Sequence, residues 1–124
     1  MTSEQGLTEF IASSFRSVWA IELLCHLRQA PAEQFTPEDL VQSLRASEAV
    51  VRQSIAGLTA GGLAVVGEDG RVRYQPASDD LDRLAAAAQM RYSVAPDAVR
   101  RIIVRSANEG LAAFANAFRL KGTP

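Results

Sequence analysis

The stretch from Thr36 to Tyr74 constrains the fold of this chain most, because it contains the signals for two helices and a hairpin in immediate succession. The first helix is predicted to start at Thr36, whose side chain can accept hydrogen bonds from backbone N–H groups. Pro37 suits the first helical position, and the acidic Glu38 and Asp39 lie at the positive end of the helix dipole. These residues predict a short helix that ends before residue 45.

A second helix is predicted over 48–60, after a turn at Arg45-Ala46 and a cap at Ser47. Its core-facing side chains follow the spacing i, i+4, i+7 and are Val51, Ile55 and Leu58. The pair Gly61-Gly62 stops the helix, and one of these glycines is expected in the left-handed conformation.

Two short strands are predicted next, over 63–66 and 72–74, and they are joined through Asp69-Gly70. An Asp-Gly pair between two apolar runs is a strong signal for a hairpin turn. Arg71 and Arg73 alternate with Val72, so both are expected on the strand face that points away from the core.

A long helix is predicted before this unit, over much of 10–29. Its apolar residues recur on one stripe, formed by Ile11, Phe15, Val18, Ile21 and Cys25. A helix this apolar is expected to be central and to contact partners on more than one face. Ser13 or Ser14 is its expected cap, and Ala30-Pro31 ends it because the residue before a proline is pushed out of the α region.

Helices are also predicted after the hairpin. One opens at Ser78, and Ala95-Pro96-Asp97 breaks it and starts another. A last segment carries Leu111, Phe114 and Phe118 at helical spacing, which predicts a place in a core or in a two-fold interface. The predicted fold class is therefore mainly α with a small β-hairpin. Residues 1–77 form one unit with an N-terminal arm, and residues 78–124 form a helical extension for dimerisation or core completion.

Composition limits the classes of function. Of the 124 residues, 48% are apolar and 22% are charged, which is ordinary for a soluble globular protein, and the net charge is −1. Any affinity for DNA must therefore come from local patches of positive charge. No secretory signal is visible, and the most apolar stretch, 18–27, is too short and too polar to span a bilayer. We expect a cytoplasmic protein with no membrane partner.

Catalytic and metal-binding motifs are missing from the sequence. Cys25 is the single cysteine, which rules out an intrachain disulfide, and its apolar context predicts a buried, reduced thiol. The single His26 adjoins it, and neighbours on a helix point about 100° apart and do not converge on an ion. No Gly-rich phosphate loop and no Ser–His–Asp set can be identified. The sequence predicts a protein that is not an enzyme and that holds neither a cofactor nor a metal.

Residues 14–76 resemble the winged helix-turn-helix fold of bacterial regulators of the MarR, PadR and ArsR type. The resemblance rests on the helices over 14–29, 37–44 and 48–60, the turn Arg45-Ala46, the exit Gly61-Gly62-Leu63 and the wing through Asp69-Gly70-Arg71. It covers about half of the chain. It implies a DNA-binding transcriptional regulator, in which the flanking helices commonly form a homodimer interface. An effector pocket, here lined by Trp19, Phe15, Tyr92 or Phe114, is typical of such regulators.

In such a fold the helix over 48–60 enters the major groove of duplex DNA, and the wing over 67–73 contacts the backbone or the minor groove. Arg side chains can bond guanine, Gln can bond adenine, and Ala can touch a thymine methyl group. A serine at the helix start and an arginine in the turn can bond phosphates. The expected DNA-binding residues are Arg45, Ser47, Ala49, Arg52, Gln53, Arg71 and Arg73.

The local charge favours an alternative, a winged-helix module that binds another protein and no DNA. Between residues 36 and 76 four arginines stand against five acids, which are Glu38, Asp39, Glu48, Glu68 and Asp69. Because phosphate neutralisation drives most nonspecific affinity, this is a lean supply of cations. A DNA binder is expected to place its four arginines on one continuous face with the acids turned away. A protein-binding module is expected to show a neutral or acidic face with exposed apolar groups.

The C-terminal segment has the opposite balance. From residue 95 to 124 five cations stand against two acids. One interpretation is that Arg100, Arg101 and Arg105 form the solvated face of a helix whose other face is apolar. The other is a cationic surface for the DNA backbone or for an acidic protein.

Overall fold

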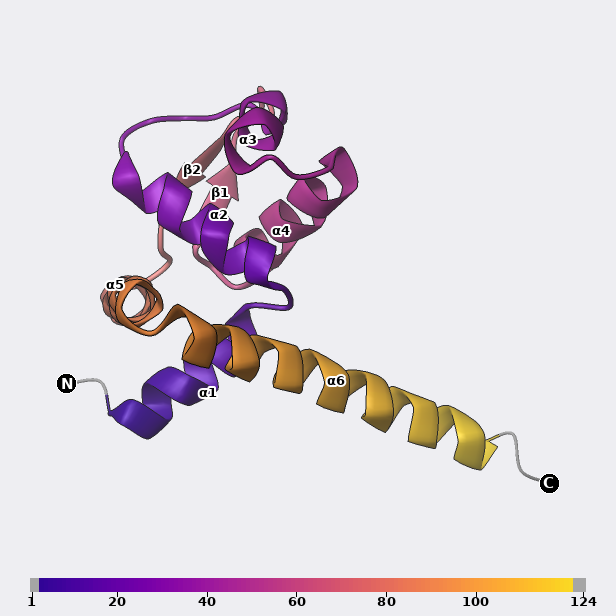
Figure 1. Ribbon diagram of the computed structural model, residues 1–124. Coiled ribbons are helices and arrows are strands. Elements are labelled where there is room, and N and C mark those ends of the chain that lie inside the picture. Colours follow the sequence, from indigo (N-terminus) through magenta and orange to yellow (C-terminus); the bar gives the residue numbers. More distant parts are fainter. Residues whose placement is uncertain (1–2, 122–124) are drawn as a thin grey trace.

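The chain folds into six helices and one small antiparallel sheet over the residues that the structure describes, as Figure 1 shows. The computed structural model describes the backbone of residues 3–121 and the side chains of residues 3–110. The elements in chain order are α1 (Glu4–Ser14), α2 (Val18–Gln29), α3 (Pro37–Leu44), α4 (Glu48–Ala60), β1 (Ala64–Val66), β2 (Val72–Tyr74), α5 (Asp79–Val94) and α6 (Pro96–Lys121). The prediction of a mainly helical fold with a small hairpin is confirmed.

Local capping fixes the starts of the middle helices. The Thr36 hydroxyl accepts a hydrogen bond from the Asp39 N–H at 3.1 Å, and the Asp39 carboxylate accepts one from the Thr36 N–H at 3.4 Å. Ser47 caps α4 and Ser78 caps α5, each through its side-chain oxygen. The cap of α3 is reciprocal, and those of α4 and α5 use the serine side chain alone; each satisfies N–H groups that a helix start leaves without partners. All three predicted helix starts are confirmed.

The single helix predicted over much of 10–29 is wrong. Two helices, α1 and α2, stand there instead, with a bend of 106° between them. Phe15 adopts an extended conformation and lies buried, with its ring packed edge-on against Phe10 at a centroid distance of 5.9 Å. Ser17, not Ser13 or Ser14, is the residue before α2. The apolar stripe continues through the bend, and Phe15 fills the core at the corner between the two helices.

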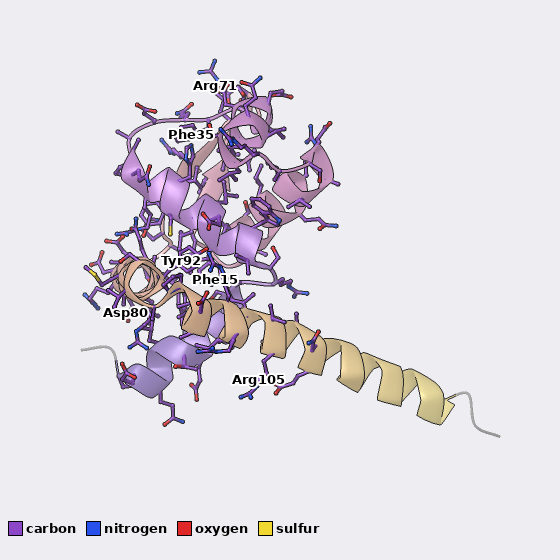
Figure 2. The ribbon with its side chains drawn as sticks, viewed as in Figure 1. Phe15, Phe35, Arg71, Asp80, Tyr92 and Arg105 are labelled. Atoms are coloured by element: carbon purple, nitrogen blue, oxygen red, sulfur yellow. The ribbon has the colours of Figure 1, made fainter. Side chains whose placement is uncertain are left out.

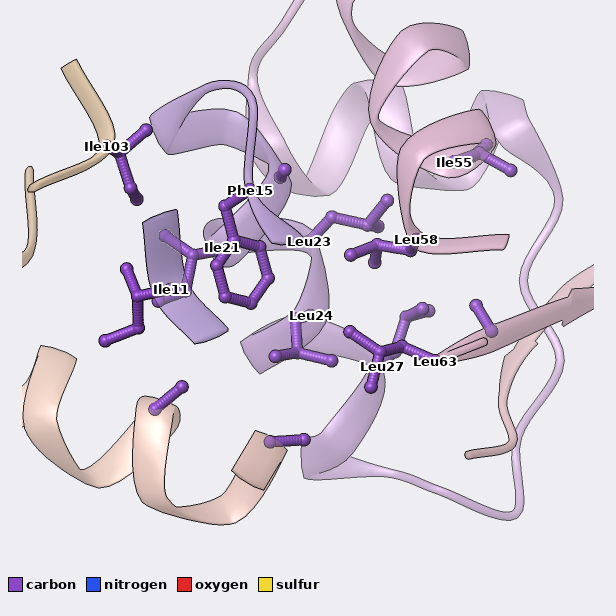
Figure 3. Close-up of a cluster of buried hydrophobic side chains, with 14 of the residues drawn as sticks. Ile11, Phe15, Ile21, Leu23, Leu24, Leu27, Ile55, Leu58, Leu63 and Ile103 are labelled. Carbon is purple, nitrogen blue, oxygen red and sulfur yellow. The ribbon is translucent and has the colours of Figure 1, made fainter. Parts of the chain in front are cut away.

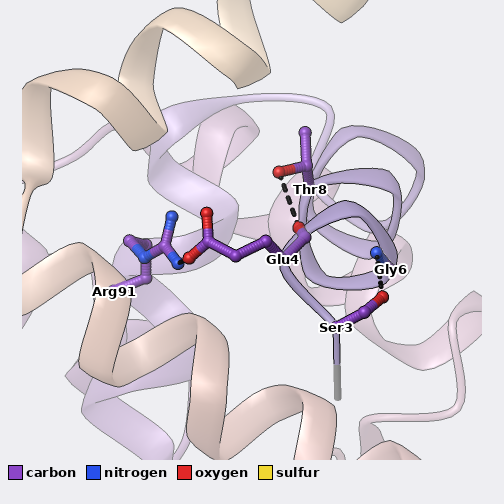
Figure 4. Close-up of polar contacts among 5 residues, drawn as sticks. All are labelled: Ser3, Glu4, Gly6, Thr8 and Arg91. Atoms are coloured by element: carbon purple, nitrogen blue, oxygen red, sulfur yellow. Dashed lines mark hydrogen bonds and ion pairs between the residues drawn. The ribbon is translucent and has the colours of Figure 1, made fainter.

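α1 begins at a cap of its own and is tied to α5. The Ser3 hydroxyl accepts a hydrogen bond from the Gly6 N–H, and Glu4 pairs with Arg91 of α5, as Figure 4 shows. The N-terminal arm expected from the sequence is therefore a helix that packs against the C-terminal helices.

The core is centred on α2. Buried side chains from α2, including Leu23, Leu24 and Leu27, meet Leu58 of α4 and Leu63 before β1, and Figure 3 shows this cluster. α5 and α6 add Ala85, Ala88, Val99 and Ile103 to the same cluster. Residues before and after position 77 thus share one continuous core.

The hairpin is linked to the segment that precedes α3. β1 and β2 pair with Val65 opposite Arg73, and Gly62 (φ 76°) and Gly70 (φ 83°) take the left-handed conformation at the helix exit and at the wing tip. Phe35 forms a further antiparallel bridge to Val72, with both N–H···O distances at 2.8 Å. These two bonds hold the end of β2 nearest the hairpin turn against the segment that precedes α3.

α6 runs without a break from Pro96 to Lys121, where the sequence suggested a helix followed by a separate last segment. Its first half packs on α1 and α5, and its second half extends past the rest of the molecule (Figure 1). The side chains of Leu111, Phe114 and Phe118 lie outside the described residues, and so does their predicted role in a core or interface.

No single helix in the described part of the chain is long and apolar enough to cross a membrane. Only α1 and α2 taken together across their bend reach such a length and composition, and much of their apolar surface lies in the core.

Candidate nucleic-acid interface

A three-residue turn connects α3 to α4. It begins at Arg45, which takes the left-handed conformation with φ 54°, the only positive φ of a residue other than glycine among the described residues. The Ala46 N–H donates to the Val41 carbonyl at 3.3 Å, and Ser47 then caps α4. The side chains of Arg45 and Ser47 are both exposed, so both are accessible at the start of α4.

α4 has one buried face and one exposed face. The buried side chains are Val51, Ser54, Ile55 and Leu58. The exposed side chains are Glu48, Ala49, Arg52, Gln53, Ala56, Thr59 and Ala60. α4 packs on α2, α3 and β1, and among the described residues no other element covers the exposed face. The predicted outward row of this helix is therefore in solvent.

The wing has a hollow on the side that faces α4, which we call the inner hollow. It has a volume of about 440 Å³ and is lined by Thr36, Pro37, Glu38, Arg52, Ile55, Val66, Asp69, Gly70 and Val72. Val66 is 42% exposed there, opposite the fully buried Val72. The inner hollow thus combines an apolar floor with a rim of mixed charge. The sequence carries no local signal for this hollow, because the hollow depends on how the wing stands over α4.

The other side of the wing carries Arg71 and Arg73. They line a second hollow of about 400 Å³, which we call the outer hollow, together with Gln34, Val65, Gly67, Glu68 and Asp69. Val72 between the two arginines is fully buried, as the alternation along the strand predicts. Figure 2 shows Arg71 at the end of the molecule farthest from α5 and α6. The wing therefore separates Arg52, on its inner side, from Arg71 and Arg73.

Acids lie beside two of these arginines. Arg52 Nε donates to Glu48 Oε1 at 2.9 Å within α4, and Arg71 Nε lies 3.9 Å from Asp69 Oδ2 in the wing. Asp69 also accepts a hydrogen bond from the Arg71 backbone N–H at 3.0 Å, so it holds the turn together. The acids are not turned away from the arginines as expected for a DNA-binding face. The i, i+4 spacing of Glu48 and Arg52 was a readable signal for their pair.

A polar seam joins the base of the wing to α2 and α5. The Tyr74 hydroxyl donates to Asp82 at 2.6 Å, and its ring lies 5.3 Å from the Arg28 guanidinium. Burial, and then the hydrogen bond to Asp82, raises the pKa of Tyr74 to about 12. The phenol is protonated at neutral pH, so its hydroxyl is a donor to Asp82 there.

A similar contact joins α2 to α5 and α6. The Tyr92 hydroxyl donates to Glu22, and burial together with this bond raises the pKa of Tyr92. Arg100 Nη1 donates to Asp97 at 3.0 Å, and its guanidinium lies 5.6 Å from the centre of the Tyr92 ring. Arg100 is thus engaged in contacts of the helical region.

The basic segment of α6 is not continuous with the wing. Figure 2 shows Arg105 on the side of the molecule opposite to Arg71. The exposed Arg101 and Arg105 share α6 with Val99 and Ile103, which are buried. This arrangement agrees with the solvated-face interpretation of the segment.

The Cys25 thiol is only partly exposed. Its burial, and then the charge of Glu22, raises the pKa of Cys25 to about 11, which leaves the thiol protonated and unreactive at neutral pH. Among the residues with described side chains, no group of three His, Cys, Asp or Glu lies close enough to hold a metal ion.

The seven predicted site residues, Arg45, Ser47, Ala49, Arg52, Gln53, Arg71 and Arg73, are all exposed on the α3–α4 turn, α4 and the wing. No protein-family model, no curated protein and no solved structure matches this chain.

Proposed function

We propose that this protein is a DNA-binding transcriptional regulator of the cytoplasm that reads duplex DNA through a winged helix-turn-helix. The fold part of the proposal is supported by the order of elements: α2, a bridge at Phe35, α3, a short turn, α4 and a hairpin. In such a unit the second helix after the turn, here α4, inserts into the major groove.

The observation that carries the proposal is the uncovered face of α4. Ala49, Arg52 and Gln53 stand in solvent on the helix that follows the turn, and the wing stands beside them. These are side chains with the donors and the methyl group that recognise base edges. Arg45 and Ser47 at the start of α4, and Arg71 and Arg73 on the outer side of the wing, are exposed cations and donors that would supply contacts to phosphates.

The proposal includes a homodimer formed through the C-terminal helices. α6 continues past the body of the molecule, and the sequence of its second half places Leu111, Phe114 and Phe118 at helical spacing. A helix of this composition is stabilised mainly by packing against a partner. A two-fold dimer would present two copies of α4 to successive turns of the major groove.

The test is a fluorescence polarisation titration of random-sequence duplex DNA at two salt concentrations. We expect binding with Kd in the range of about 1–100 µM that weakens as salt rises. The double variant R52A/R71A should weaken binding about tenfold and reduce its salt dependence. The matched control is R101A/R105A, which removes the same charge from exposed positions of α6 and should leave binding nearly unchanged. If salt-sensitive binding is absent when protein is titrated to about 300 µM, the DNA proposal is wrong.

The second candidate is a module that binds another protein through the same face. The inner hollow favours it, because its floor exposes Val66 and its rim mixes Arg52 with Glu38 and Asp69. This candidate predicts that the titration gives no salt-sensitive binding to DNA.

A further inference from the structure

An acid stands one turn before the central arginine of the exposed α4 face, and the two are bonded. Glu48 Oε1 accepts from Arg52 Nε at 2.9 Å, and both side chains are more than half exposed (69% and 57%). Exposed ion pairs of this spacing contribute little to stability. The pair is therefore better explained by what it does to the position of the Arg52 guanidinium than by its contribution to the fold.

The contact uses one particular donor of the guanidinium. Arginine has five N–H donors, and the bond to Glu48 uses the one on Nε, which leaves the two terminal NH₂ groups free. Those two groups form the parallel pair of donors that matches O6 and N7 of guanine. A side chain already held in this geometry loses less rotamer freedom on binding.

We infer that Glu48 is a positioning residue that makes Arg52 a reader of guanine, an inference that rests on the proposed DNA-binding function. Glu48 holds Nε so that the guanidinium meets the base with its two terminal nitrogens. The same carboxylate repels phosphate, so it lowers the affinity for DNA of any sequence. Glu48 thus reduces total affinity and increases the discrimination between base pairs, which is the quantity a regulator needs among many competing sites.

The other acids near this face have different contacts. Asp69 bonds the backbone of the wing turn, and Asp39 completes the cap of α3. Glu38 lines the inner hollow with Arg52, yet no hydrogen bond or ion pair joins Glu38 to Arg52. Glu38 is therefore a matched control for Glu48, because the same change of charge can be made there without touching the geometry of Arg52.

The experiment selects duplexes from a random 20-base-pair library with the full-length protein and its variants, and it measures binding to the unselected library in parallel. R52A identifies the base position at which the preference for guanine depends on Arg52. At that position E48Q should lower the guanine preference by about threefold or more. The same variant should bind the unselected library about twofold more tightly, because a negative charge is gone.

E38Q should also tighten binding to the unselected library, but it should leave the guanine preference unchanged. E48D keeps the charge on a shorter side chain, so it should lose guanine preference without the gain in affinity. Circular dichroism checks that each variant is folded. If E48Q raises the affinity for DNA but leaves the guanine preference unchanged, as expected for E38Q, then Glu48 acts only through its charge and the inference is wrong. If the wild type shows no salt-sensitive binding to the library, the DNA function itself is wrong, and the inference with it.

Discussion

Two arginines at the wing end are held within single elements, whereas two arginines of the helical region bridge different elements. At the wing end, Arg52 pairs with Glu48 of the same helix, and Arg71 lies near Asp69 of the same turn. At the other end, Arg91 of α5 pairs with Glu4 of α1, and Arg28 of α2 bonds Gln89 of α5. Arg83 and Arg100 of the helical region pair within their own helices. Contacts within one element can be exchanged without moving helices apart, whereas contacts between elements hold the helices together.

This difference indicates which arginine side chains are available to bind a partner. The wing-end arginines can exchange a local carboxylate for a phosphate or a base edge, and the fold keeps its packing. Arg28 and Arg91 cannot leave their partners without loosening α5. The comparison is sharpened by four measurements, ordered here by the size of the expected effect.

The largest effect on stability is expected in the core that the wing end and the helical end share. Leu58 of α4 is fully buried, so Leu58→Ala should lower the free energy of unfolding by about 2–5 kcal/mol through lost burial and an unfilled cavity. Urea denaturation followed by circular dichroism and by Trp19 fluorescence should give one coincident transition, because one continuous core joins the two ends.

Val104→Ala is the control for this core change. Val104 of α6 is 50% exposed, so its truncation should change the free energy of unfolding by less than about 0.5 kcal/mol. Separate transitions for the two probes, or equal effects of the two truncations, would show that the ends do not share one cooperative core.

The next effect separates stability from binding at the α3–α4 turn. Arg45 is held at φ 54°, a conformation that costs side-chain-bearing residues about 1–2 kcal/mol and that glycine adopts without strain. Arg45→Gly should therefore raise the free energy of unfolding by about 0.5–1 kcal/mol, after the extra entropy of glycine in the unfolded chain is subtracted. The same variant should weaken DNA binding and reduce its salt dependence. Arg45→Asn provides the control, since it removes the charge and retains a side chain that tolerates this conformation. A loss of stability in Arg45→Gly would contradict the account of the turn.

An effect of similar size tests the two kinds of arginine directly. Arg91→Ala removes a contact between α5 and α1, and Arg91 is the less exposed arginine of the two, so unfolding should become easier by about 0.5–1 kcal/mol. Arg52→Ala removes only a contact within α4 and should cost less than about 0.5 kcal/mol. Thermal melts measure the loss of stability in each variant, and the DNA titration measures its loss of affinity for DNA. Arg91→Ala should have the larger effect in the melts, and Arg52→Ala the larger effect in the titration. The same order in both assays would remove the distinction between structural and available arginines.

The wing end was predictable from the sequence because its signals are local. Thr36 and Ser47 each stand directly before a helix and accept from an N–H three residues on, and Gly62 and Gly70 mark their own turns. The bend at Phe15 was not predictable, because the apolar stripe continues through it and no proline or glycine marks it. The bridge from Phe35 to Val72 joins residues far apart in the chain, and no local pattern encodes such a pairing. The seven candidate site residues came from helix periodicity, strand alternation and the resemblance to winged regulators, which also gave Arg45 and Ser47 their roles. The i, i+4 spacing signalled the pair of Glu48 with Arg52, whereas the contact of Arg71 with Asp69 depends on how the turn folds.

The smallest effect concerns Tyr74, which links the base of the wing to α5. Its pKa is raised from about 10 in the unfolded chain to about 12 in the folded protein, by burial first and then by its bond to Asp82. Below pH 10 the phenol is protonated in both states and its contribution to stability is complete. Between pH 10 and 12 the unfolded chain releases the proton more easily, so stability falls as pH rises. The effect is small because much of the side chain is solvent-screened.

Urea denaturation at pH 9 and pH 11 checks this link, with Tyr74→Phe as the variant. The variant keeps the ring beside Arg28 and removes the ionisable hydroxyl, so its loss of stability over this interval should be smaller than that of the wild type. Cys25→Ser is measured in parallel, because the raised pKa of Cys25 gives it a loss of the same sign between about pH 9 and 11. Equal losses in wild type and Tyr74→Phe would mean that the hydroxyl does not couple the wing to α5. The two ends would then be joined by the shared apolar core and by the contacts of α2 with α5.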